Sequence, residues 1–193
     1  FAVSIDSQVV DAQVAAFLKE NHIGNIILFS KNFEDADVLK ALTASLHKTI
    51  TENVGVSPLI SIDQEGGSVT RITTGGTFFP GAMAIAAGGT PEDARKIGRA
   101  MGEELRYFGI NLNFAPDSDV NTNPKNPVIG VRSFGDDAET VADFVSAYAA
   151  GLQQSGVLAC VKHFPGHGDT SVDSHHGLPR VDQTKAQLQS GAL

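Results

Sequence analysis

The sequence predicts an α/β fold in which parallel strands alternate with helices. Apolar residues recur at helical spacing in four segments, and short runs rich in β-branched residues lie between them. These runs lack strict alternation of apolar and polar residues, which is typical of parallel strands covered on both faces. A cluster of polar residues follows each run, at the edge where α/β proteins build their sites. The β-α-β-α order implies right-handed crossovers.

The helices and strands can be assigned in chain order. The helical faces consist of Val10, Val14, Phe17 and Leu18; of Val38, Leu42 and Leu46; of Ile97, Met101, Leu105 and Phe108; and of Val141, Phe144, Val145, Tyr148 and Leu152. The runs assigned as largely buried strands span residues 25–29, 58–62, 110–115 and 157–161, and FAVS at the start adds part of an earlier strand. The Pro- and Asn-rich residues 121–127 are interpreted as a loop after a strand, not a domain boundary.

The composition is that of a globular protein, and the length suffices for one ordinary domain but is short for the largest single-domain folds. The chain has 193 residues, of which 41% are hydrophobic and 19% charged. No apolar run approaches the roughly 20 residues of a membrane span, and the first residues lack the basic start of a signal peptide. The compartment stays open between the cytoplasm and the cell envelope or exterior.

Charge and cysteine content narrow the possible partners. The chain has 14 Lys and Arg residues and 22 acidic residues, and its net charge is −8. This charge disfavours nucleic acid as a partner and favours a neutral ligand. The single cysteine, Cys160, excludes an internal disulfide. Because it lies in the apolar run VLACV, we expect an inert core thiol.

Carboxylates and an arginine follow the run that ends at residue 62. Asp63 and Glu65 precede Gly66 and Gly67, so at least one carboxylate should lie on the rim of the sheet. The alternative is a simple turn with a solvated glutamate. Arg71 is near enough in sequence to join the same pocket, although a surface position is equally consistent with this segment.

Two later segments add cationic side chains. Arg132 in NPVIGVRSFG offers a planar fork of donors for a carboxylate or a set of hydroxyls; the structural alternative is an arginine paired with Asp119 or Asp136. Lys162 and His163 directly follow VLACV, so strand alternation predicts that one points into the crevice and the other away. A lysine there needs a charged or hydroxylated partner.

The stretch KHFPGHGDTSVDSHHGLP, residues 162–179, holds four of the six histidines. Asp173 lies close enough to orient His175 for general acid/base work, and the glycines of residues 166–168 would let the loop fold over a ligand. A zinc or iron site is the alternative, although the spacing matches no common zinc signature. Its ligands would come from His163, His167, Asp173, His175 and His176.

Four segments, GNIILF, IDQEGGSVTR, NFAPDSDVNTNPKNPVIGVRSFG and KHFPGHGDTSVDSHHGLP, together resemble glycoside hydrolase family 3, and within it the β-N-acetylglucosaminidase branch. The resemblance runs from about Val14 onward, and the KHFPGHG…DSH…LP motif is highly specific. One departure is Asp117, which stands in APDSDV where the family usually has an apolar residue.

The resemblance implies a TIM barrel with its site on the carboxyl rim, no cofactor or metal, and a retaining double displacement through a covalent glycosyl-enzyme intermediate. His175 would be the acid/base, paired with Asp173. The hydroxyls of a terminal N-acetylglucosamine would be held by Asp63, Arg132, Lys162 and His163, with Arg71 supporting Asp63.

The same resemblance places the nucleophile on a later strand, in a motif such as SDDL or SDDM, beyond Leu193. With four clear strands and part of a first against the eight of a TIM barrel, residues 1–193 are expected to form the N-terminal half to two-thirds of one catalytic domain. The strand edge after VLACV would then be exposed, and the remainder of the domain is the expected partner.

The expected activity is removal of terminal, non-reducing β-linked N-acetylglucosamine from oligosaccharides derived from peptidoglycan or chitin. Three alternatives stay open: an amino-sugar-binding module without catalysis, a family 3 β-glucosidase, and a metal-dependent hydrolase that uses the histidine cluster.

Overall fold

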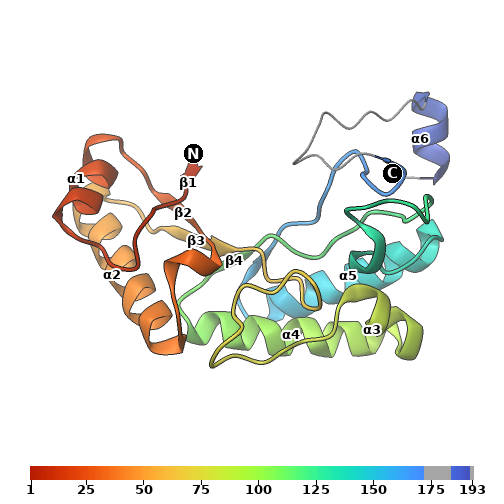
Figure 1. Cartoon of the computed structure of the whole chain (residues 1–193), viewed down its shortest axis with the longest axis horizontal. Coiled ribbons are helices and arrows are strands. Elements are labelled where there is room, and N and C mark those ends of the chain that lie inside the picture. The colour runs from red at the N-terminus through yellow and green to blue at the C-terminus, as the bar shows by residue number, and fades with distance from the viewer. Residues whose placement is uncertain (172–183, 192–193) are drawn as a thin grey trace.

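A single parallel sheet organises the molecule, as the computed structural model of residues 1–171 and 184–191 shows (Figure 1). Its five strands follow the chain order β1-β2-β3-β4-β5, and every neighbouring pair is parallel. The strands are β1 (Ala2–Val3), β2 (Asn25–Leu28), β3 (Leu59–Ile62), β4 (Leu112–Asn113) and β5 (Leu158–Ala159). Sequential parallel order is that of a TIM barrel, here an unclosed one, so the predicted α/β class is confirmed.

Helices connect the strands. They are α1 (Ala12–Glu20), α2 (Ala36–Val54), α3 (Ala82–Gly88), α4 (Pro91–Tyr107), α5 (Ala138–Gln154) and α6 (Lys185–Gly191), with 3₁₀ turns η1 (Ser30–Asn32) and η2 (Gly130–Arg132). The four predicted helices appear as α1, α2, α4 and α5, whereas the short α3 and α6 were not predicted. Each of the four begins at a side chain that accepts a hydrogen bond from the third helical N–H; these caps are Asp11, Asp35, Thr90 and Asp137.

The strands β4 and β5 are shorter than predicted, because the chain leaves the sheet early to build its loops. The expectation that the last run is covered on both faces is wrong. Leu158 and Val161 are 50% and 49% exposed, and Cys160 is only partly buried. Phe17 also faces solvent, whereas the adjacent Leu18 is fully buried.

Helices α4 and α5 run side by side along one part of the molecule, while α1 and α2 lie at the other end (Figure 1). Glycines permit the close approach of α4 and α5. A Cβ on Gly151 would lie 2.1 Å from the carbonyl oxygen of Arg95, and one on Gly98 would lie 2.3 Å from that of Tyr148. No helix in the described ranges is long and apolar enough to cross a membrane.

Candidate functional site

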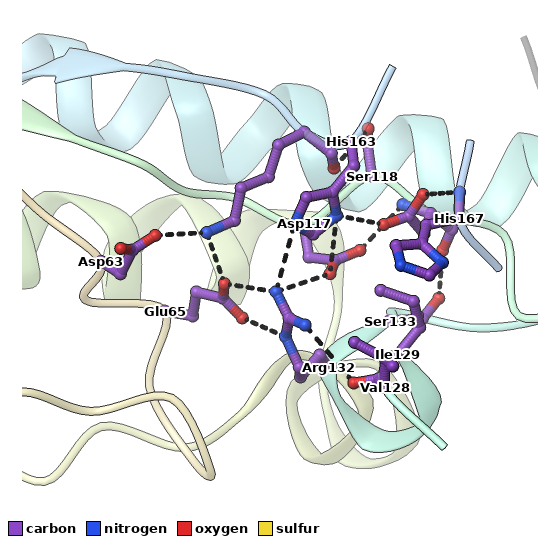
Figure 2. A network of polar contacts seen from close by, with 12 residues as sticks. Asp63, Glu65, Asp117, Ser118, Val128, Ile129, Arg132, Ser133, His163 and His167 are labelled. Atoms are coloured by element: carbon purple, nitrogen blue, oxygen red, sulfur yellow. Dashed lines mark hydrogen bonds and ion pairs between the residues drawn. The ribbon is translucent and has the colours of Figure 1, made fainter. Parts of the chain in front are cut away.

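Polar side chains from four segments meet at the carboxyl edge of the sheet (Figure 2). They come from the loops after β3, β4 and β5 and from η2, as expected where parallel strands end. We call this set the polar network; it consists of Asp63, Glu65, Asp117, Asp119, Arg132, Lys162, His163 and His167.

Lys162 joins the two carboxylates that follow β3. Its Nζ lies 2.7 Å from Asp63 Oδ1 and 2.7 Å from Glu65 Oε1, which confirms the expectation of a charged partner for this lysine. The backbone between the carboxylates is fixed by Asn113 of β4, whose side-chain amide accepts the N–H of Gln64 at 3.0 Å and donates to its carbonyl at 2.8 Å. The adjacent strand therefore sets the positions of both carboxylates.

Arg132 forms a two-point pair with Glu65. Its Nε donates to Oε2 at 2.9 Å and its Nη2 to Oε1 at 2.8 Å, the parallel geometry that suits a guanidinium and a carboxylate. Burial alone would raise the pKa of Glu65, but the bonds from Arg132 and the charge of Lys162 outweigh it and lower that pKa. The alternative of pairing with Asp119 or Asp136 is wrong, because Glu65 is the bonded carboxylate.

His163 is oriented by Asp119. Its Nδ1 lies 2.6 Å from Asp119 Oδ2, and the backbone N–H of His167 donates to Asp119 Oδ1 at 2.5 Å. Burial favours the neutral acid here too, but the hydrogen bonds from His163 and His167 outweigh it, so the pKa of Asp119 is lowered. The hydroxyl of Ser133 donates to the carbonyl oxygen of Asp119, which anchors the loop that carries it.

Asp117 lies behind this histidine and is almost completely buried. Burial, followed by the charge of Asp119, raises the pKa of Asp117 to about 8. Among the described residues, Asp117, Asp119 and His163 have potential metal-ligand atoms within 4.8 Å of one another. Arg132 Nη2, however, lies 3.6 Å from Asp117 Oδ2 and 3.4 Å from His163 Nε2. The Arg132 guanidinium, a permanent cation, thus lies beside two of these three side chains. The cluster therefore does not suit a metal ion.

The prediction that Lys162 and His163 point to opposite sides is wrong. Regular strand structure ends at Ala159, so alternation no longer applies, and both side chains enter the polar network. No hydrogen bond or ion pair joins Arg71 to Asp63 in the described part of the chain. Its backbone N–H donates to Gln64 Oε1 at 2.8 Å, and its guanidinium lies 6.0 Å from the centre of the Phe29 ring.

The proposed acid/base pair, Asp173 and His175, lies outside the described residues, as does His176. Just before them, Gly168 has a role beyond conformational freedom, because a Cβ there would lie 1.8 Å from the carbonyl oxygen of Val120. The network members that the predicted site omitted are Glu65, Asp117, Asp119 and His167. Their positions in the sequence could have indicated them, because all four residues follow predicted strands.

An apolar groove of about 600 Å³ borders the network on the side of α5. It shares Asp119 and His163 with the network, and its other walls include Val141 and Val145 of α5. Phe164, at 86% exposed, lies on the same border. The groove lies beside the segment that follows β5, and no further strand pairs with β5 in the described ranges.

Comparison with known proteins connects this arrangement to one family. The chain matches the family model of the glycosyl hydrolase family 3 N-terminal domain over residues 3–193. It is 42% identical over 186 residues to β-hexosaminidase A of Pseudoalteromonas piscicida, covering 94% of this chain and 31% of that protein.

Solved structures agree. The glycoside hydrolase family 3 β-N-acetylglucosaminidase from Paenibacillus sp. strain FPU-7 matches with a TM-score of 0.95 and 44% identity, over 99% of this chain and 36% of that one. NagZ from Neisseria gonorrhoeae in complex with N-trifluoroacetyl-D-glucosamine matches with a TM-score of 0.90 and 33% identity, over 99% of this chain and 57% of that one. The chain thus spans 31% to 57% of the length of these relatives. The prediction of an incomplete TIM barrel is confirmed, and the chain belongs to glycosyl hydrolase family 3.

Proposed function

We propose that the protein is a retaining β-N-acetylglucosaminidase that removes terminal, non-reducing N-acetylglucosamine from oligosaccharides derived from peptidoglycan or chitin. The observation that carries the proposal is the convergence of Asp63, Arg132, Lys162 and His163 at one sheet edge. Family membership supports it, as does the sugar analogue bound by the gonococcal NagZ.

The network suits the recognition of a neutral, hydroxyl-rich ring. The carboxylate of Asp63 accepts hydrogen bonds from hydroxyls, and Lys162 and Arg132 can only donate them. Because Lys162 and Arg132 are already paired with Glu65, a sugar would meet side chains whose positions are fixed before it arrives, which reduces the ordering cost of binding. Arg71 has a weaker part in this proposal, as a neighbour of the Asp63 loop.

In the proposed reaction, His175 donates a proton to the leaving oxygen and later removes one from water, with Asp173 orienting its imidazole. An aspartate of the remaining part of the domain attacks the anomeric carbon. We assign residues 1–193 to the N-terminal part of that single TIM-barrel domain. The uncovered edge of β5 and the groove beside α5 support this, because both expose apolar surface that further barrel elements would cover.

The test is hydrolysis of p-nitrophenyl β-N-acetylglucosaminide by the complete gene product. His175→Ala should lower kcat by roughly 10²- to 10⁴-fold. His22→Asn is the matched control, since His22 is an exposed turn residue with φ 51°, a conformation that asparagine tolerates.

Proton NMR of the first-formed sugar should show the β anomer. An α product would contradict retention, and faster cleavage of the β-glucoside would favour the β-glucosidase alternative. Binding of N-acetylglucosamine without turnover by the folded protein would favour a binding module.

A further inference from the structure

Asp117 is a buried carboxyl group with one oxygen that accepts no hydrogen bond. Its Oδ1 accepts the backbone N–H of Asp119 at 2.9 Å. Its Oδ2 is buried without a hydrogen-bond partner in the described part of the chain, 3.6 Å from Arg132 Nη2 and 3.9 Å from His163 Nδ1 (Figure 2). A carboxylate oxygen in that position would lose its hydration without gaining a donor.

The donors around Asp117 are already committed to other acceptors. Arg132 donates to Glu65 through both Nε and Nη2, and His163 Nδ1 is bonded to Asp119. The charged and titratable groups that face Asp117 are Glu65 after β3, Asp119 on its own loop, Arg132 on η2 and His163 after β5. The backbone of Lys162 pairs with that of Asp117, while its side chain lies on Asp63 and Glu65. Ionised Asp117 would add one more negative charge to a region whose two permanent cations already serve other carboxylates.

A proton on Asp117 removes this conflict. The protonated oxygen becomes a donor, and its neighbour Asp119 is an ionised acceptor. Burial and the charge of Asp119 raise the pKa of Asp117. A neutral Asp117 beside an ionised Asp119 therefore avoids two adjacent buried negative charges.

The pair also fixes the tautomer of His163. Arg132 can only donate, so its contact with His163 Nε2 at 3.4 Å makes that nitrogen the acceptor and places the ring proton on Nδ1, facing Asp119. We propose that Asp117 is a positioning residue that works as a neutral acid, keeping Arg132 on Glu65 and His163 in its Nδ1-protonated form. A charged Asp117 would draw Arg132 away from Glu65.

The consequence for sugar binding rests on the proposed function, whereas the protonation of Asp117 does not. If Arg132 and His163 hold the sugar, loss of the proton from Asp117 should weaken substrate binding and leave the chemical step alone. KM for the aryl β-N-acetylglucosaminide should then rise about tenfold per pH unit above the pKa of Asp117, because the neutral fraction falls tenfold per unit. The value of kcat should stay unchanged over the same pH range.

The first arm of the test is NMR of ¹³C-labelled complete gene product, with the Asp117 carboxyl assigned by through-bond correlation. This arm needs no variant to fold. We expect a carboxyl that is protonated at pH 7 and titrates near pH 8. A carboxyl of Asp117 that is ionised at pH 7 would overturn the proposal.

The second arm compares Asp117→Asn with the wild type and with Asp143→Asn, a matched loss of charge at an exposed position of α5. Asparagine is neutral and can donate to Asp119, so KM at pH 6 should stay within about threefold of the wild type, and the alkaline rise in KM should disappear. Asp143→Asn should keep that rise.

An alkaline rise that persists in Asp117→Asn would refute the positioning role. If no folded protein hydrolyses the substrate, the proposed function fails, while the carboxyl titration still decides the state of Asp117.

Discussion

The substitution Glu65→Gln tests whether the polar network is held together by charge. Glu65 accepts two hydrogen bonds from Arg132 and forms an ion pair with Lys162 at 2.7 Å, and it is the carboxylate that these two cations share. Glutamine keeps the shape of the side chain but removes its charge. Arg132 and Lys162 would then lie beside each other without the anion between them.

The expected cost can be estimated from burial. The side chains of Arg132 and Glu65 are 14% and 7% exposed, so solvent screens their interaction weakly. Removing one partner of a buried ion pair costs about 3–5 kcal/mol, mostly because the other charge stays buried and unpaired.

Low pH should reduce the destabilisation that Glu65→Gln causes. The pKa of Glu65 is lowered from its ordinary 4.5 in the folded protein, so its contribution is complete above that value and is lost as the pH falls through the folded pKa. The gap in the free energy of unfolding between wild type and Glu65→Gln should be full at pH 7 and smaller at about pH 3.5.

The assay is urea unfolding of the complete gene product at both pH values, with Glu103→Gln as the matched control. Glu103 pairs with Arg99 on the surface of α4, where both side chains are more than half exposed, and such pairs contribute about 0–1 kcal/mol. A cost for Glu65→Gln no larger than that of Glu103→Gln, or one that does not change with pH, would refute the reasoning.

Three further substitutions test other parts of the structure by the same unfolding measurement. Gly151→Ala should destabilise by at least about 1–3 kcal/mol, because its methyl group meets the carbonyl of Arg95, whereas Gly88→Ala has open space and should stay within about 0.5 kcal/mol; equal effects would contradict the helix contact. Thr90→Ala removes the cap of α4 and should cost about 1 kcal/mol; no loss would argue against the cap. The pKa of Asp117 is raised from 3.8 to about 8 in the folded protein. The free energy of unfolding of the wild type should therefore fall by up to about 1.4 kcal/mol per unit as the pH rises from about 4 to about 8. The same slope in Asp117→Asn would count against a buried neutral acid.

Local sequence patterns were sufficient for the four long helices and for the positions of the strands. Helical periodicity located α1, α2, α4 and α5, and β-branched runs located the strands, because a buried stripe or a buried run is a property of neighbouring residues. The short helix α3, within a segment rich in glycine and alanine, gave no such signal. The exposure of one side of β5 could not be predicted from its apolar residues, because exposure depends on which other elements pack against a strand.

The sequence by itself determined which residues stand at the carboxyl edge of the sheet, because parallel strands bring the segments after them to one side. Only the tertiary structure decided how they pair. Glu65 and Arg132 are 67 positions apart, and Asp63 and Lys162 are 99 apart, so no local pattern connects them. The proton on Asp117 is decided in the same way, since desolvation and the charges of Asp119, Arg132 and Glu65 act on it only after the chain has folded.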